Sequence, residues 1–324
     1  TQDESKAHRA RNSKPVRRKP TGQKTIIQKL KEAANDGNVA SQIELANRYQ
    51  KGEGVTKDLQ RANHFFKLAA KNGDIGAMVR YGVCLQEGIG MEKPDYEKAA
   101  DYFEKAIEKG KAKNDKKKAK NDKKKAKNDK KKAENPTDGE EEEDIEMYEG
   151  INENAMYYYS ILLLEGKGVA KDEKKGLKYL KAAADLHQSY AQNKYGMMLE
   201  FGKGVEKDII KAIEYYKSSA DEGNEVGMFN YADALEKGKY VEQDLKKAAF
   251  LFRLSYKRGY APAICRYGEM LLEGRGVEAD VDEARRLFLL AINNNYPSAY
   301  VSLGQMYLTG NGFEKNEEEA TRLF

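Results

Sequence analysis

A repeated glycine turn is the pattern in this sequence that could do chemistry. Residues 165–172 read Glu-Gly-Lys-Gly-Val-Ala-Lys-Asp, and glycines that precede a helix can cradle a phosphate with their backbone N–H groups. A nucleotide-binding loop also needs a Gly-Lys-Ser/Thr ending and a preceding strand, which this sequence does not offer. The turn instead recurs, with each step from Gly166 to Gly310 being 36 residues. A phosphate site needs one such loop, so the repetition indicates a structural turn.

The histidines and cysteines do not form a catalytic or metal-binding pattern. His8 lies in the N-terminal tail, and His64 and His187 lie in different repeats, without metal-ligand spacing. Cys84 and Cys265 fall in the second and sixth repeats, which do not touch in a solenoid. We therefore expect no enzyme activity, no cofactor, no metal and no disulfide. Unpaired cysteines favour the cytoplasm; the nucleus and the endoplasmic reticulum stay open because the N-terminus looks incomplete.

Residues 188–223 show how one repeat should fold. Small, aliphatic and aromatic residues share one face of each of two helices: Ala191, Tyr195, Gly196 and Leu199, then Ala212, Tyr215, Tyr216 and Ala220. Gly202 suits the left-handed position that ends the first helix, and Asp208 is a good N-cap for the second. Helices this short cannot bury their apolar faces alone, so the repeats must stack. The sequence predicts an all-α, right-handed solenoid of seven antiparallel helix pairs in 36-residue repeats, a tetratricopeptide-like (TPR-like) superhelix.

The repeat resembles a known family. The pattern Ala-x3-Tyr-Gly-x2-Leu-x2-Gly-x-Gly-Val-x2-Asp, then Lys-Ala-x2-Tyr-Tyr-x2-Ala-Ala and a final Gly, is similar to the Sel-one-like repeat (SLR), a relative of the tetratricopeptide repeat. The resemblance covers most of residues 38–324 outside an insertion, with departures at Tyr240 and Asn316. It implies a non-enzymatic adaptor that holds protein or peptide partners on the concave face. Narrower implied roles are an adaptor of ubiquitin-ligase complexes in the endoplasmic reticulum and a regulatory array of a kinase-linked signalling protein.

The chain divides into five segments. These are a basic disordered tail (1–24), a capping half-repeat helix (25–37), repeats one and two (38–110), a charged low-complexity insertion (111–151) and repeats three to seven (152–324), the last truncated. The insertion repeats Lys-Asn-Asp-Lys-Lys-Lys-Ala and then turns acidic. Such segments lack apolar residues for a core, so we expect disorder, with 111–149 looping out while repeats two and three stack directly.

Charge and hydrophobicity disfavour nucleic acid and a membrane as partners. The net charge is +5, but the basic excess lies in the tail, and the repeats are nearly neutral. No apolar run is long enough to span a membrane. The lysine-rich segments leave binding to nucleic acid or an acidic surface as an alternative. The adjacent acidic half of the insertion disfavours that alternative, because it can neutralise the lysines in place.

We expect a partner site on the side of the first helix of each repeat that faces the concave surface, in the repeats where the residues on this stripe are apolar. In repeats three and four this stripe carries Tyr158, Ile161, Tyr190, Lys194, Met197 and Phe201, whereas it is mixed in repeats one and two and mostly polar in repeats five to seven. Exposed aromatic and apolar side chains often anchor a partner. Arg80 and Arg266 are expected to add charge complementarity. For Tyr190 and Phe201, packing against a neighbouring helix is an alternative. The oligomeric state is not indicated.

Overall fold

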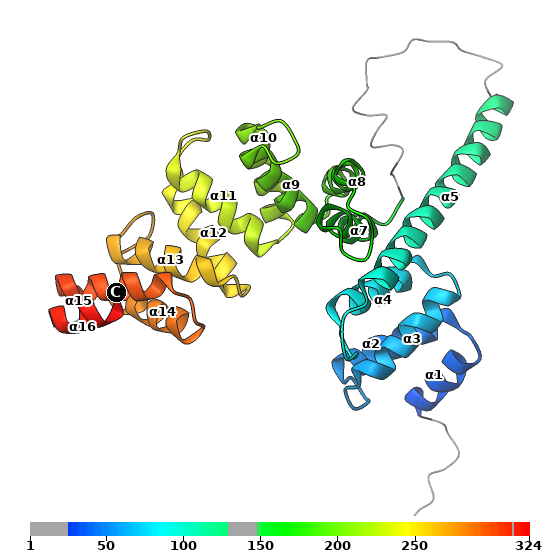
Figure 1. The fold of residues 1–324 in the computed structure, drawn as a ribbon, viewed down its shortest axis with the longest axis horizontal. Helices are drawn as coiled ribbons and strands as arrows, with labels where there is room; N and C mark the ends of the chain where they lie inside the picture. The colour runs from blue at the N-terminus through cyan, green and yellow to red at the C-terminus, as the bar shows by residue number, and fades with distance from the viewer. Residues whose placement is uncertain (1–24, 129–147, 149, 313) are drawn as a thin grey trace, which may run out of the picture. The chain divides into compact units, whose positions relative to one another are not determined.

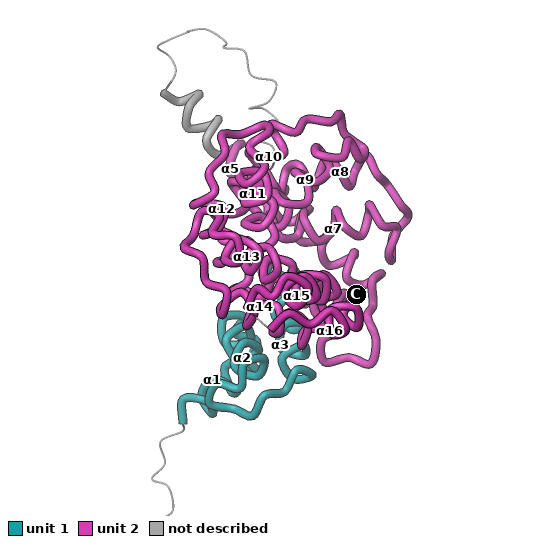
Figure 2. Tube along the Cα trace, turned by 90° about the vertical axis from the view of Figure 1, so that its left-hand side faces the viewer, with its two compact units in different colours: residues 1–74 teal, residues 75–324 magenta. Residues whose placement is uncertain are grey.

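The computed structural model describes residues 25–128, 148, 150–312 and 314–324. Within these residues the protein has 15 α-helices and no strand, which confirms the predicted all-α class (Figure 1). Contacts divide the chain into two compact units, residues 1–74 and residues 75–324 (Figure 2). The first unit contains α1 (Ile26–Asn35), α2 (Val39–Lys51) and α3 (Leu59–Lys71).

The second unit contains the remaining helices, mostly of 13 residues. They are α4 (Ile75–Glu87), α5 (Tyr96–Asn128), α7 (Glu153–Glu165), α8 (Glu173–Asp185), α9 (Ser189–Phe201), α10 (Ile209–Asp221), α11 (Glu225–Lys237), α12 (Leu245–Lys257), α13 (Ala261–Glu273), α14 (Val281–Asn293), α15 (Ser298–Thr309) and α16 (Glu317–Leu323). Within this unit each helix packs against the next one along the chain.

The glycine turn acts as predicted, as a helix stop followed by a helix start. Gly166, Gly202 and Gly274 each end a helix in the left-handed conformation, at φ 67°, 65° and 66°. After each turn an aspartate begins the next helix; the Asp208 carboxylate accepts a 3.0 Å hydrogen bond from the Lys211 amide. Glycine adopts positive φ without the steric penalty of other residues. The turn therefore ends one helix and positions the start of the next.

Small residues let the two helices of a repeat approach closely. A Cβ added to Gly196 would lie 2.8 Å from the Tyr216 ring, and one added to Gly268 would lie 2.8 Å from the Phe288 ring. The second turn glycine has a different partner. A Cβ on Gly276 would overlap the carbonyl of Leu245, at the start of the second helix of the preceding repeat. The first contact closes a helix pair, and the second stacks one pair on another.

Repeats two and three stack directly, as predicted. The Phe103 ring of α5 lies 5.4 Å from the Tyr158 ring of α7, nearly parallel to it. The Tyr159 hydroxyl donates to Glu104 Oε1 over 2.8 Å, and Lys175 Nζ lies 3.0 Å from the same oxygen. Desolvation by itself would raise the pKa of the Glu104 carboxyl, but the two hydrogen bonds and the nearby lysine charges together lower it. The insertion thus interrupts the sequence without interrupting the stack.

The expectation of disorder is wrong for the first part of the insertion. Helix α5 has 33 residues and continues to Asn128, well past the end of the repeat at 110. Lysine and alanine are good helix formers. Because α5 is already nucleated within packed repeat two, its extension needs no new nucleus. The acidic part of the insertion, residues 134–147, lies outside the described residues.

The two ends of the insertion meet in a packed cluster. Tyr148 is only 4% exposed and Ile151 only 3%. The Tyr148 ring meets the Tyr179 ring edge-on at 6.2 Å, and Lys111 Nζ lies 5.9 Å and 5.4 Å from the centres of these two rings. The expectation that 111–149 as a whole loops out is therefore wrong, because Lys111 and Tyr148 belong to the packed unit.

The glycine turn gives a first prediction, with a matched pair of variants in one turn. Gly274→Ala places alanine at positive φ with its nearest neighbour 3.5 Å away, which should lower the free energy of unfolding by about 1 to 2 kcal/mol. Gly276→Ala adds the overlap with Leu245 and should lower it by roughly 3 kcal/mol or more. Chemical denaturation followed by circular dichroism measures both. Equal losses would show that the second glycine does not control stacking.

A second prediction separates the packed ends of the insertion from its middle. Tyr148→Ala should lower the free energy of unfolding by about 3 kcal/mol, because it empties a buried aromatic site. Replacing residues 118–146 by a short Gly/Ser linker should change it by less than about 1 kcal/mol, since Asn114 and Gly150 are neighbours in space. The control is Tyr240→Ala, at a tyrosine that is 47% exposed. A large loss in the linker variant would place residues 118–146 in the core.

Candidate functional site

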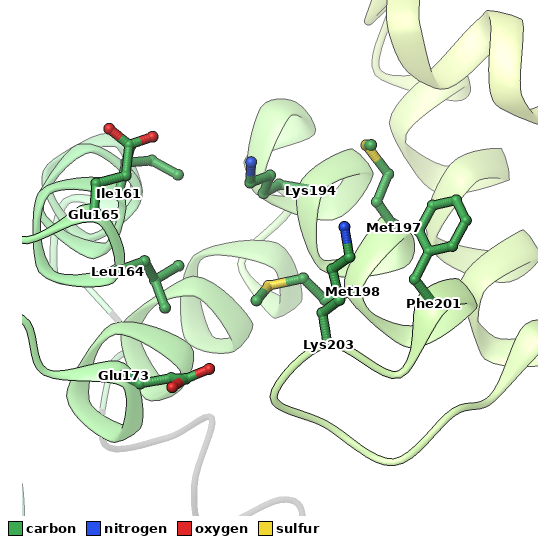
Figure 3. Close-up of a pocket in the computed structure, with 9 residues that line it drawn as sticks. All are labelled: Ile161, Leu164, Glu165, Glu173, Lys194, Met197, Met198, Phe201 and Lys203. Carbon is green, nitrogen blue, oxygen red and sulfur yellow. The ribbon is translucent and has the colours of Figure 1, made fainter.

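An apolar groove lies between repeats three and four. It is a cavity of about 280 Å³ formed by α7, the start of α8, α9 and the turn after α9. Its lining residues are Ile161, Leu164, Glu165, Glu173, Lys194, Met197, Met198, Phe201 and Lys203. Figure 3 shows the residues of α7 and α8 on one side and those of α9 and its turn on the other.

The floor of the groove is hydrophobic and only partly covered. Ile161 and Leu164 of α7 are half-buried, as are Met197 and Met198 of α9. Phe201, the last residue of α9, is 58% exposed. Methionine side chains are flexible and polarisable, so they adapt to differently shaped partners. The groove therefore offers anchoring surface that the protein itself leaves in contact with water.

Neighbouring residues hold this surface in place. Asn193 Nδ2 lies 3.8 Å from the Met197 sulfur, and Asn230 of α11 donates a 2.8 Å hydrogen bond to Asn193 Oδ1. The Lys203 ammonium lies 5.4 Å from the centre of the Phe201 ring, within range for a cation–π interaction. Helix α11 thus helps to position α9, and the glycine turn brings Lys203 back over the aromatic residue.

The structure gathers four of the residues predicted for partner binding into this groove: Ile161, Lys194, Met197 and Phe201. Tyr158 is less exposed than expected, because it stacks on Phe103, and burial raises the pKa of its hydroxyl. Tyr190 is 46% exposed and lies beside Tyr157 at 6.1 Å. Neither tyrosine lines the groove.

The two predicted arginines are not part of the groove. Arg80 is exposed on α4, in repeat two. Arg266, on α13, forms ion pairs with Glu236, Asp233 and Glu269. Its charge is thus already matched within the protein, which removes the reason for assigning it to a partner.

Sequence reasoning missed five of the lining residues, Leu164, Glu165, Glu173, Met198 and Lys203. It followed one stripe of the first helix, whereas the groove also uses the adjacent stripe, the following turn and the next helix. The repeated glycine turn was the sequence feature that could have indicated the residues of the turn. Because the turn folds back against the preceding repeat, residues beside the glycines, such as Lys203, come close to the helix surface.

A second groove occupies the equivalent place one repeat further along. It has a volume of about 190 Å³ and is lined by Glu200, Ile209, Asn230, Asp233, Lys237, Lys239, Tyr240 and neighbouring residues. Asn230 and Asp233 stand 36 residues after Lys194 and Met197. The hollow is therefore a product of repeat geometry, while its chemical character depends on which side chains line it. Apolar side chains line both grooves, with Ile213 and Tyr216 among those of the second, and the groove between repeats three and four differs in containing the exposed Phe201.

The residues that could support catalysis or metal binding are scattered. In the described part of the chain, no group of three His, Cys, Asp or Glu side chains could hold a metal ion. His8 lies outside the described residues. Both cysteines are free and buried, and burial raises the pKa of the Cys84 thiol to about 11. No helix among the described residues has the length and apolar character needed to cross a bilayer.

The buried cysteines give a third prediction. A thiol of ordinary pKa, about 8.5, is partly ionised at pH 8, whereas Cys84 with a pKa of about 11 is almost entirely protonated. Since the thiolate is the nucleophile, labelling of Cys84 by a thiol reagent at pH 8 should be at least about 100-fold slower in the folded protein than in denaturant. Mass spectrometry of the labelled peptides measures both rates. Rapid labelling of folded protein would contradict the burial of Cys84.

Comparisons with known proteins agree with this architecture. The Sel1 repeat model matches residues 39–74, 75–111, 154–187, 189–224, 226–260, 261–296 and 297–324. A comparison with curated proteins finds no match. Among solved structures, a protective antigen of uropathogenic Escherichia coli with an SLR fold has a TM-score of 0.63 and 24% identity, over 93% of this chain and 55% of that chain. A Sel1 repeat protein from Oxalobacter formigenes has a TM-score of 0.60 and 22% identity, over 83% and 99%.

The chain therefore spans little more than half the length of the Escherichia coli protein. At these identities the structural likeness shows a shared fold.

Proposed function

The chain belongs to the Sel1 repeat family, and on this premise we propose that its groove between repeats three and four holds a segment of a partner protein. Proteins of this family are generally non-enzymatic scaffolds for protein–protein interaction. The observation that carries the proposal is the exposed Phe201, beside a cavity lined by Ile161, Met197 and Met198. Partly exposed apolar side chains of this kind contribute most of the binding energy in many protein–protein interfaces.

The size of the groove favours a peptide segment over a folded surface. At about 280 Å³, the cavity is close to the lower limit for small-ligand pockets, about 300 Å³. It would accept one or two side chains of a partner, with the rest of the segment lying along α9. A role in a ubiquitin-ligase complex of the endoplasmic reticulum, or as a regulatory array in signalling, would use the groove in this same way.

The nucleic-acid alternative would use another surface. Lys113, Lys116, Lys117 and Lys118 are exposed on α5, on the helical extension that the sequence did not predict. Contacts to phosphates weaken steeply with added salt, because they release counterions. Apolar anchoring in the groove does not, so salt dependence distinguishes the two surfaces.

A fourth prediction tests the groove by selection from a displayed peptide library, with the folded protein as bait. We expect enriched peptides that share an apolar residue and bind about tenfold more weakly to Phe201→Ala, which corresponds to about 1.4 kcal/mol. The matched control is Phe250→Ala, because Phe250 is also on a helix surface and is 60% exposed. It should bind these peptides as the unmodified protein does.

Two results would contradict the proposal. One is equal loss of binding in the Phe201 and Phe250 variants, which would indicate nonspecific hydrophobic attachment. The other is enrichment only of acidic peptides whose binding disappears between about 50 and 200 mM salt and is unchanged in Phe201→Ala, which would move the activity to the lysines of α5. Circular dichroism of each variant establishes that it is folded.

A further inference from the structure

The rim of the groove between repeats three and four is charged, and its two sides have opposite signs. Glu165, at the end of α7, and Glu173, at the start of α8, lie on one side. Lys194 of α9 and Lys203 of the following turn lie on the other side, as Figure 3 shows. Leu164 and Met198 lie between them, and Met197 lies beside Phe201 on the far side of the two lysines. A ligand in the groove therefore meets negative charge at one edge and positive charge at the other.

These charges are largely unmatched within the protein. Across the parts of the chain that the structure describes, no ion pair joins the acidic edge to the basic edge. Glu165 lies 2.8 Å from Lys167, but both side chains are about half exposed, at 42% and 53%, where an ion pair is weak. The Lys203 ammonium faces the Phe201 ring. The rim thus keeps most of its charge available to a ligand.

The next groove provides an internal comparison. There Glu200 accepts a 2.6 Å hydrogen bond from the Tyr216 hydroxyl, and Lys237 forms an ion pair with Asp233. Ile209 and Asn230 occupy the positions that correspond to Glu173 and Lys194. In that groove Glu200, Asp233 and Lys237 therefore have partners within the protein, and only Lys239, at the position of Lys203, keeps a charge that faces an aromatic ring, that of Tyr240. The pattern of opposed, unmatched edges is therefore a property of the groove between repeats three and four and does not follow from repeat geometry.

We infer that this groove selects a peptide segment in which an apolar residue has Lys or Arg on one side and Asp or Glu on the other. This inference rests on the proposed function and adds the chemical class of the partner. The apolar residue enters the cavity, the basic residue faces Glu165 and Glu173, and the acidic residue faces Lys194 and Lys203. A segment with charges of one sign would bring like charges together at one edge. Complementary charges of this kind mainly provide specificity and a fixed orientation.

The test uses three synthetic peptides with the same length and the same central Leu-Phe pair. One has two lysines before the pair and two glutamates after it, the second has lysines on both sides, and the third has glutamates on both sides. Fluorescence anisotropy with the full chain at about 50 mM salt measures their affinities. We expect the mixed peptide to bind at least about tenfold more tightly than either of the others.

A charge reversal makes the test specific to this rim. In the double variant Lys194→Glu and Lys203→Glu both edges are acidic, so the all-lysine peptide should become the tightest ligand. The control is Lys246→Glu with Lys257→Glu, which makes the same change of net charge at two exposed lysines of α12. This control should keep the preference for the mixed peptide. Unchanged circular dichroism establishes that both variants are folded.

The outcomes separate the inference from the proposed function. Equal binding of the three peptides, with binding still lost in Phe201→Ala, would overturn the charge selectivity and leave the groove as a peptide site. A preference that changes equally in both charge variants would show that net charge decides, and would also overturn the inference. If none of the three peptides binds, the inference fails; the proposed function fails with it only if the displayed library also enriches nothing.

Discussion

The close contact between a small residue on one helix and an aromatic ring on its partner is the interaction on which this protein depends. Helices of 13 residues are about 20 Å long and cannot form a stable core by themselves. Gly196 against Tyr216 and Gly268 against Phe288 bring the two helices of a repeat together. The aromatic rings then fill the space between them. Without this approach, each helix would keep its apolar face in water.

Once the two helices of a repeat are packed together, the repeats can stack on one another, and this stacking forms the groove between repeats three and four. The second turn glycine lets the loop of one repeat lie against the start of the second helix of the preceding repeat, as Gly276 does against Leu245. Repeats placed this way leave a hollow between their first helices. The same hollow appears at two successive places, at about 280 Å³ and 190 Å³. A regular scaffold thus offers a series of hollows, and the side chains that line each one decide its chemical character.

The insertion shows how a solenoid accommodates extra sequence. Its ends are held by the contacts of Lys111 and Tyr148 with Tyr179, beside the junction of repeats two and three. Phe103 packs on Tyr158 across that junction, and Phe252 packs on Arg266 at the equivalent positions of two uninterrupted repeats. Because each repeat touches only its neighbours, an insertion that leaves these faces intact does not disturb the stack.

The sequence alone determined the class of fold, the repeat length and the role of the glycine turn. These depend on helix periodicity, on positive φ at glycine and on N-capping by aspartate. Each of these rules involves only residues close together in the sequence. It also indicated repeats three and four as the apolar part of the first-helix stripe, including Met197 and Phe201. The residues of the groove that come from α8 and from the turn were not predictable, because their proximity depends on how one repeat packs on the next.

Tertiary structure alone decided which predicted side chains are available. Tyr158 and Met197 look equivalent in a helical stripe and are both half-buried, yet Tyr158 stacks on Phe103 whereas Met197 lines the groove. In the sequence Arg266 looks like an exposed cation, but it forms ion pairs with acidic residues of α11, in the preceding repeat.

The sequence did not predict the helical extension of α5 for a related reason. Composition favours disorder in an isolated segment, whereas attachment to a packed helix removes the cost of nucleation. The exposure of a side chain, its ion pairs and the nucleation of a helix all depend on contacts with residues distant in the sequence. The fold determines which residues these are.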